Sequence, residues 1–375
     1  MDLTASGARG VATTKSAARG LPAAATVLAA TVVSLVGLTW DVQWHSDVGP
    51  DTFFTLPHLL IYAGSAIAGL ASLVVVLTTT AAARRGRPVD ARVGGRAVGV
   101  FGRTFSAPVG YLVSGVGAAL FLLYGLWDQW WHGLYGFDAV IASPPHIGLL
   151  LSITVTMVGT VMVFAAARER RWGTVGVFVT LGVLLAFSTV TAIGLQPLEG
   201  GVVDSITVGT AFLSVLLVLM GAGFLRRPGG AVAVAVVLAV IQAAFWWFSP
   251  WAARAYADLV GLPVRDYVSG VPEMPSLMPM CLVGVSVLLE LLLHAALRRG
   301  RSAGRISLLA GGIGGLLVAA CTPVQNMWVY SSHLPGATTM IATSVAGAAL
   351  GVLGGFLGWR FGRMLRLLAR ASEGR

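Results

Sequence analysis

Two stretches of this sequence carry the same unusual arrangement of aspartate, histidine and tryptophan. One runs from residue 40 to 58 as WDVQWHSDVGPDTFFTLPH, and the other runs from residue 127 to 146 as WDQWWHGLYGFDAVIASPPH. In each stretch an aspartate and a histidine are four residues apart, which on a helix places both side chains on one face. A second histidine follows a proline where the next apolar run begins. One carboxylate and two imidazoles suit copper, zinc or iron, so the sequence predicts two metal sites, with the ligands Asp41, His45 and His58 in the first and Asp128, His132 and His146 in the second.

Each stretch also holds an acid and a tryptophan that could support its metal site. Asp51 and Asp138 follow the first histidine of their copies by six residues. They are candidates for hydrogen-bonding an imidazole and fixing its tautomer, and a solvated loop acid is the equal alternative. Trp44 and Trp131 precede that histidine directly, and we expect them to help keep bulk water away from the ions.

Three further residues are weaker candidates for metal ligands. His333 precedes the last apolar run much as His58 and His146 precede theirs, so it could belong to a degenerate third copy. Met278 and Met280 offer soft sulfur donors that suit Cu(I). Methionine at a helix end more often serves packing, so packing is the favoured interpretation of these two.

Glu290 and His294 lie one turn apart in an apolar run. An acid inside a membrane helix usually has a function, and these two side chains could relay protons. Pairing of Glu290 with the nearby Arg298 and Arg299 is the alternative.

The composition is that of a membrane protein. The chain has 375 residues, of which 56% are hydrophobic and 11% charged, and its mean hydropathy is +0.83; a soluble domain of this length is less apolar and more charged. The formal charge is +10, but the arginines form short clusters between apolar runs, as topogenic residues do. We therefore expect a lipid bilayer as the partner and no nucleic acid. Cys281 and Cys321 could form one disulfide at most.

Apolar runs long enough to span a bilayer recur about ten times. The sequence predicts an all-α, polytopic integral membrane helical bundle, with spans near residues 21–40, 56–82, 108–127, 145–167, 173–195, 205–225, 230–249, 276–297, 306–324 and 335–358. All but two of the 25 Lys and Arg residues, Arg254 and Arg265, fall on one side of these spans. The positive-inside rule then places both termini in the cytoplasm and the metal sites on the extracytoplasmic side of the cell (plasma) membrane.

The chain divides by composition into three parts. Residues 1–20 are polar and basic and are predicted to form a disordered arm. Residues 21–171 form a four-helix metal-binding unit with both copies of the motif, and residues 172–375 form a six-helix unit of unknown role. Within that unit, residues 251–262 could lie as an interfacial helix, and Gly347, Gly351 and Gly355 present a close-packing face to a neighbouring helix.

The first stretch resembles the C subunit of the particulate methane monooxygenase and ammonia monooxygenase, the copper membrane monooxygenases. The shared pattern is Asp-x-x-Trp-His followed by Asp-Thr-x-Phe-Thr-x-x-His, which here runs from Asp41 to His58, with Tyr62 just beyond. The resemblance covers the first four helices only. It implies that Asp41, His45 and His58 hold copper, and that a second site with the spacing of Asp128, His132 and His146 lies nearby. The family has Asn where this chain has Asp128, which favours a harder or more oxidised ion here.

Three functions are compatible with these features. The first is a copper-dependent membrane monooxygenase, or a subunit of one with partner subunits, that oxidises a small apolar or ammonia-like substrate with dioxygen. The second is a copper-binding or copper-handling membrane protein without catalysis, in which zinc or iron could replace copper. The third is a proton-coupled transporter that uses the acids and imidazoles without a metal. A homo- or hetero-oligomer is compatible with all three.

Overall fold

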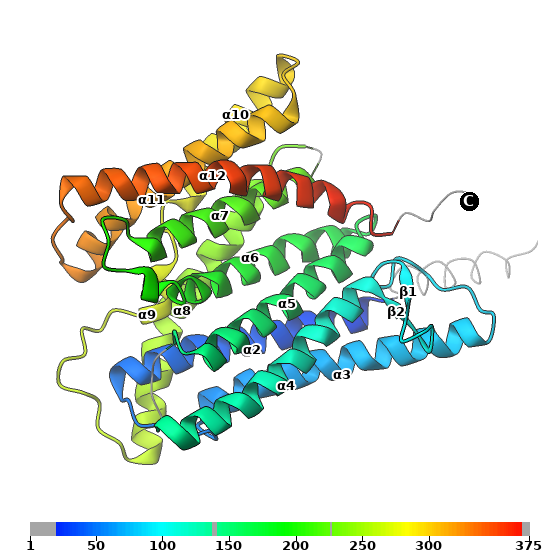
Figure 1. The fold of residues 1–375 in the computed structure, drawn as a ribbon, viewed down its shortest axis with the longest axis horizontal. Coiled ribbons are helices and arrows are strands. Elements are labelled where there is room, and N and C mark those ends of the chain that lie inside the picture. Colours follow the sequence, from blue (N-terminus) through cyan, green and yellow to red (C-terminus); the bar gives the residue numbers. More distant parts are fainter. Residues whose placement is uncertain (1–19, 137–140, 226, 370–375) are drawn as a thin grey trace, which may run out of the picture.

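The chain folds almost entirely into helices (Figure 1). The computed structural model describes residues 20–136, 141–225 and 227–369, so the predicted arm at 1–20 lies outside the described residues except for its last position. The long helices are α2 (Leu21–Asp47), α3 (Leu56–Arg84), α4 (Val109–Tyr135), α5 (Pro144–Ala166), α6 (Arg171–Ile193), α7 (Ser205–Phe224), α8 (Gly230–Val260), α10 (Leu282–Arg298), α11 (Ala303–Tyr330) and α12 (Ala337–Leu365). The short elements are β1 (Ala97–Val100), β2 (Phe105–Pro108), the 3-10 helix η1 (Gln196–Leu198) and α9 (Glu273–Leu277).

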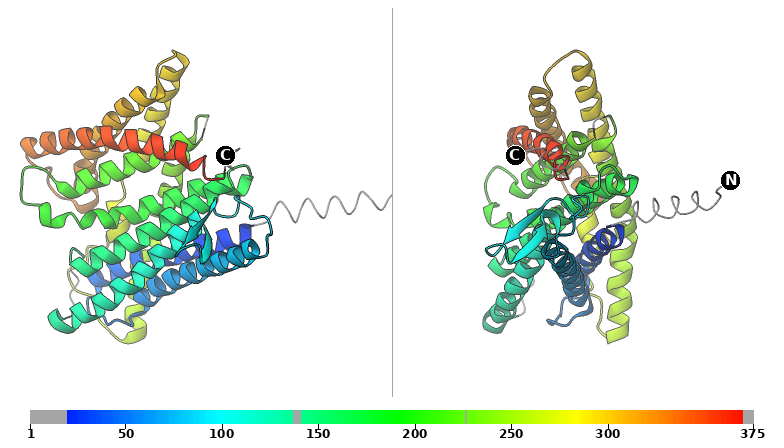
Figure 2. Two further views of the ribbon diagram at one scale, coloured as in Figure 1. Left: turned by 45° about the vertical axis from the view of Figure 1, so that its right-hand side comes forward. Right: turned by 90° about the vertical axis from the view of Figure 1, so that its right-hand side faces the viewer.

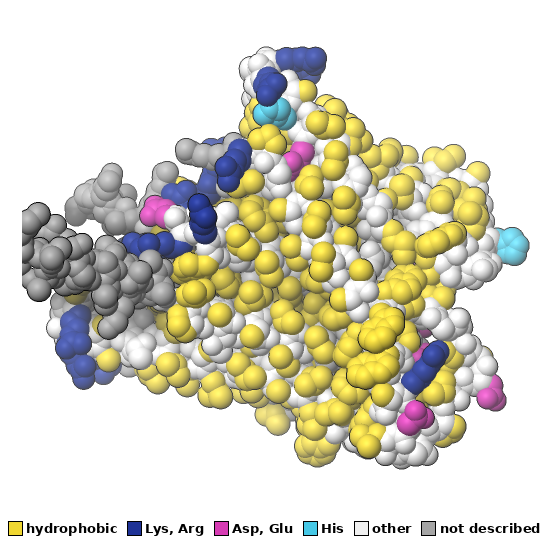
Figure 3. Space-filling model, turned by 180° about the vertical axis from the view of Figure 1, so that it is seen from behind, with side chains coloured by type: hydrophobic (Ala, Val, Ile, Leu, Met, Phe, Trp, Pro, Cys, Tyr) yellow, Lys and Arg dark blue, Asp and Glu magenta, His cyan; other side chains and the backbone are white. Residues whose placement is uncertain are grey.

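The surface of the molecule matches a membrane environment. Hydrophobic side chains cover most of the face seen in Figure 3, with most of the visible Lys and Arg toward one end and several acids toward the other. Among the described residues, ten helical segments are long and apolar enough to cross a bilayer, α9 and α10 counting as one. The predicted all-α fold is therefore confirmed, and its helices are compatible with a membrane bundle.

The long helices form two groups with α6 between them. Helices α2 to α5 lie on one side and α7, α11 and α12 on the other, with α6 between them (Figure 1). Helix α8 runs beside α2 and packs against it (Figure 2). The start of α2 and the end of α12 lie at the end of the bundle that carries the β1–β2 hairpin, and the repeated motif lies at the opposite end (Figure 1).

Small residues bring the helices of each motif-bearing hairpin close together. A side chain at Gly37 in α2 would collide with the backbone of Pro57 and Ile61 in α3. Likewise, a side chain at Gly159 in α5 would collide with the backbone of Ser114 in α4. Close backbone approach of this kind is typical of membrane helix pairs, and it lets side chains at the helix ends reach a common point.

Several helices differ from their predicted limits. Helix α8 continues through Pro250 to Val260, so most of the predicted interfacial helix is an extension of a membrane-length helix. The predicted span at 276–297 is broken between α9 and α10, where the amides of Gln242 and Gln325 both donate to the carbonyl oxygen of Met278. The predicted glycine face of α12 is confirmed, because a side chain at Gly351 would collide with the Gly311 carbonyl of α11.

Candidate metal centres

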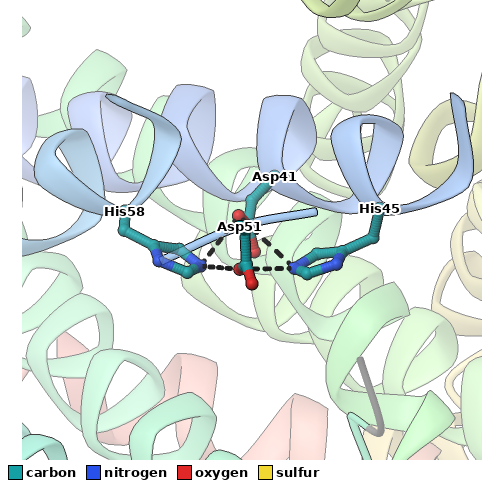
Figure 4. Close-up of side chains that lie close together, drawn as sticks. All are labelled: Asp41, His45, Asp51 and His58. Atoms are coloured by element: carbon teal, nitrogen blue, oxygen red, sulfur yellow. Dashed lines mark ion pairs between the residues drawn. The ribbon is translucent and has the colours of Figure 1, made fainter. Parts of the chain in front are cut away.

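The first predicted trio converges, and Asp51 joins it (Figure 4). Asp41 and His45 lie one turn apart in the last two turns of α2, His58 lies in the first turn of α3, and Asp51 comes from the connection between them. His45 Nε2 is 3.9 Å from Asp41 Oδ1 and 3.2 Å from Asp51 Oδ2, while His58 Nε2 is 3.0 Å and 3.4 Å from the same two oxygens. The two carboxylates thus lie between the two imidazoles.

The second predicted trio also converges, and both of its imidazoles again present Nε2 to the aspartate. His132 Nε2 is 3.5 Å and His146 Nε2 is 3.3 Å from Asp128 Oδ1. Asp128 and His132 are buried on α4, and His146 enters from the first turn of α5 after Pro144 and Pro145. Asp138, the counterpart of Asp51, lies outside the described residues. Each hairpin therefore brings together one carboxylate and one imidazole from the end of its first helix and a second imidazole from the start of its second helix.

Backbone carbonyls set the tautomer of one histidine in each cluster. His58 Nδ1 lies 3.0 Å from the Thr52 carbonyl oxygen, and His132 Nδ1 lies 2.9 Å from the Gly136 carbonyl oxygen. Because a carbonyl can only accept, Nδ1 carries the proton in both rings. In the neutral ring, Nε2 then presents a lone pair to the carboxylate oxygens. This is the arrangement in which proteins orient histidine toward a metal.

The carboxylate oxygens at the centre of the clusters lie among imidazole nitrogens. Asp41 Oδ1 and Asp128 Oδ1 are buried, and within the described part of the chain their close polar neighbours are imidazole nitrogens, so each contact needs a proton or a cation in it. Ligand atoms about 2.0–2.1 Å from a tetrahedral ion lie roughly 3.3 Å apart, and most of the nitrogen–oxygen separations fall near that value. A buried carboxylate oxygen that faces imidazole lone pairs is costly, so both clusters fit a bound cation.

Both clusters face one cavity of about 600 Å³. Its apolar walls include Phe53 and Tyr62 beside the first cluster and Phe121 and Leu150 beside the second. The Tyr62 ring lies 6.1 Å from the His58 ring and 6.1 Å from the Phe121 ring, and so connects the two walls. The cavity could hold a small apolar molecule next to either cluster.

The C-terminal half of the chain closes part of this cavity. Arg265, Val268, Glu273 and Leu277, from the connection between α8 and α10, contribute to its lining. The Arg265 guanidinium donates to the His45 carbonyl oxygen at 2.9 Å, and so caps the end of α2. Residues 172–375 therefore help to position the first cluster, although the sequence assigned them no role.

The connection after α2 is held so that Asp51 turns back toward the helix. Gly49 has a φ of +102°, and any side chain there would collide with the Arg265 guanidinium. The buried Trp44 donates from Nε1 to the Pro50 carbonyl oxygen at 2.9 Å and packs against Tyr256 of α8. Trp44 thus anchors the loop that carries Asp51.

Trp44 and Trp131, which we expected to help keep water away from the ions, are not among the residues that line the cavity. Trp44 is 1% exposed and lies behind the first cluster, against Tyr256. Trp131 is half-buried and packs against Tyr135, with ring centroids 4.5 Å apart and the rings tilted by 42°. Phe53, Tyr62 and Phe121 occupy the positions next to the ligands instead, because the helical face that carries Asp41 and His45 turns Trp44 away from them.

The remaining candidates lie outside both clusters. His333 is exposed in the connection between α11 and α12. Met278 is fully buried in the apolar core, and Met280 is 36% exposed. The packing interpretation is the one that the position of Met278 supports.

Glu290 makes a contact that differs from both expectations, which were a proton relay with His294 and an ion pair with Arg298 or Arg299. Its carboxylate accepts from the backbone N–H groups of Gly229 and Ala231, the latter at 2.6 Å. It therefore stabilises the start of α8, where backbone donors lack intrahelical partners. No ion pair connects Glu290 with His294, Arg298 or Arg299 within the described ranges.

Asp51, expected as a hydrogen-bond partner of an imidazole or as a solvated loop acid, lies beside both imidazoles, while Arg265 and Glu273 were not among the expected cavity residues. The Asp51 side chain is only 7% exposed and is as close to the imidazoles as Asp41 is. Its recurrence six residues after the histidine was the available signal. Arg265 and Glu273 gave no such signal, because they come from a connection far along the chain, and Tyr62 was named only in the pattern shared with the monooxygenase family.

Comparison with protein-family models, with curated proteins and with solved structures finds no match. The resemblance to the copper membrane monooxygenases rests on the residues of the first stretch alone.

Proposed function

We propose that this protein is a membrane metalloprotein with two transition-metal sites on one cavity, acting as a copper-dependent monooxygenase or as a subunit of one. The observation that carries the proposal is the pair of buried carboxylate oxygens, Asp41 Oδ1 and Asp128 Oδ1, each of which faces two imidazole nitrogens at distances that a bound cation would bridge. Asp41, His45, Asp51 and His58 would hold one ion, and Asp128, His132 and His146 the other.

Copper is the metal we propose, with zinc or iron as alternatives for the same donors. Bound copper would supply the activation of dioxygen beside a C–H or N–H bond. The protein would bind a small apolar or ammonia-like substrate between Phe53, Tyr62 and Phe121 and keep bulk water from it. The second carboxylate of the first cluster, Asp51, makes that site more anionic than a trio would be.

The charge distribution supports a particular orientation in the plasma membrane. Because the sequence places nearly all Lys and Arg residues on the other side of the predicted spans from the clusters, we infer that both termini are cytoplasmic and that the clusters are extracytoplasmic. Substrate could then enter from the outer leaflet or the outer solution. Electrons would come from a partner, and separate monooxygenase subunits are the partners that the resemblance implies.

The test is metal content followed by oxygen consumption on the purified full chain. We expect up to two ions per chain in the wild type, and loss of the first when Asp41 and His45 are both changed to Ala. Retention of copper without oxygen consumption under several reductants would favour a copper-handling protein.

A proton-coupled transporter is the second candidate. The separation of 3.0 Å between His58 Nε2 and Asp41 Oδ1 would also suit an imidazolium paired with a carboxylate. In that case the wild type would bind no copper, zinc or iron, and proton uptake in vesicles would depend on His58.

A further inference from the structure

A second cavity lies far from the metal clusters, at the end of the bundle where arginines gather. Its volume is about 530 Å³, and it lies between the α5–α6 connection, the start of α11 and the end of α12. Four arginines line it: Arg168, Arg360, Arg363 and Arg366. No Asp or Glu is among its described lining residues, so the cavity is strongly positive.

Three of the four arginines in this cavity have no acidic partner among the described residues. Arg168, Arg360 and Arg363 form no ion pair within the part of the chain that the structure describes. The first turn of α11 adds to the charge, because Gly304 lines the cavity and the Ser302 N-cap makes no side-chain hydrogen bond to the helix. Free N–H groups at a helix start favour a bound anion.

An unsatisfied buried donor belongs to the same cavity. Trp359 is one of the lining residues, and its indole Nε1 is buried without a hydrogen-bond partner among the described residues. Buried indole N–H groups usually have an acceptor. An oxygen-rich ligand in the cavity would supply it.

The cavity borders on apolar surface that suits an acyl chain. Phe356, Met364 and Leu367 also line it, and they are 39%, 53% and 52% exposed. A ligand that fits both parts has an anionic head and a hydrocarbon tail. We propose that this cavity binds the phosphodiester headgroup of an anionic phospholipid, with its acyl chains along α12. Basic pockets between membrane helices on the cytoplasmic side bind such headgroups in other proteins.

The test measures lipid retention by the full chain in mixed micelles of phosphatidylglycerol and phosphatidylcholine, using native mass spectrometry. We expect the wild type to retain phosphatidylglycerol preferentially. The double variant Arg360→Gln, Arg363→Gln should bind it roughly tenfold more weakly, since two charge contacts are lost. Trp359→Phe, which keeps the ring and removes only the N–H donor, should weaken binding by a smaller factor.

The matched control is Arg298→Gln, Arg299→Gln, which removes the same charge from the end of α10, outside the cavity. We expect this control to retain phosphatidylglycerol as the wild type does. Equal loss in both double variants would mean general charge attraction and would overturn the proposal. So would equal retention of the two lipids, or saturation of the cavity by inorganic phosphate with no retention of phosphatidylglycerol. None of these readouts requires a metal, so the inference stands or fails separately from the proposed function.

Discussion

At the scale of single residues, the metal clusters are defined by which ring nitrogen faces the carboxylates. The Thr52 and Gly136 carbonyls keep the proton of His58 and His132 on Nδ1. Only a cation or a second proton can then lie between Nε2 and a carboxylate oxygen without repulsion. A metal ion and a proton therefore compete for the same nitrogen atoms.

This competition predicts a pH dependence of metal retention. As the pH is lowered from 8 to 5, protons compete with the ion for the imidazole nitrogens, and the bound ion should be released. Carboxylates alone would keep the ion to about pH 4. Equilibrium dialysis of the purified protein at several pH values measures the release, and constant retention down to pH 5 would show that the histidines are not ligands.

Asp51 should behave as a ligand of the first cluster. Asp51→Asn keeps the shape of the side chain but removes its charge, so we expect the first ion to bind at least roughly tenfold more weakly. The second cluster should keep its ion. Metal titration with a competing chelator gives both affinities. Asp266→Asn is the control, because Asp266 is exposed in the α8–α9 connection and does not line the cavity; equal affinities in the two variants would count against Asp51.

At the scale of elements, the connections position ligands that the helices alone would leave apart. Gly49 has a backbone conformation that few other residues adopt, and Arg265 occupies the space where a side chain would be. The turn at Gly49 and the cap at the end of α2 therefore depend on each other. Asp51 reaches the imidazoles only if both are formed.

Gly49→Ala should lower stability by about 1–3 kcal/mol, since it combines an unfavourable φ with a collision. Arg265→Ala should lower the stability of the Gly49→Ala variant by less than it lowers that of the wild type, because the alanine side chain has already displaced the guanidinium. Thermal unfolding in detergent of the four proteins of this double-mutant cycle measures the difference. Simple additivity of the two changes would mean that Gly49 and Arg265 are not coupled.

The membrane-length helices were predictable from the sequence, but their extensions and breaks were not. Apolar length identified the ten spans, because a bilayer sets a minimum length for any helix that crosses it. It did not show that α8 passes through Pro250, or that the span after Glu273 is broken where Gln242 and Gln325 supply donors from other helices. These features depend on tertiary partners, which periodicity does not reveal.

The convergence of Asp and His side chains was predictable from their spacing and from the repeat of the motif. Asp41 and His45 share a helical face by spacing alone, and the repeated motif gave the closing histidines. The position of Asp51 between the imidazoles was not predictable. It depends on the path of a loop and on the contact of that loop with Arg265, which is more than two hundred residues away in the chain.

At the scale of the whole molecule, each metal cluster connects two helices. The first joins the end of α2 to the start of α3, and the second joins the end of α4 to the start of α5. Both lie on a cavity that α6 and the α8–α10 connection also line. A bound ion should therefore stabilise the folded bundle as a whole, because unfolding would separate its ligands.

Removing the metal should consequently lower the Tm. A ligand present at a hundred times its Kd stabilises the folded state by about 2.7 kcal/mol, so chelation should produce a clear shift and metal addition should reverse it. The double variant His58→Ala, His146→Ala should melt at one temperature with or without metal, since each cluster has lost its closing imidazole. The control is His333→Ala, which removes an exposed histidine outside both clusters and should keep the full metal-dependent shift. A shift that persists in the double variant would mean that the ions bind elsewhere, and the two clusters would then be pairs of carboxylates and imidazoles that hold protons.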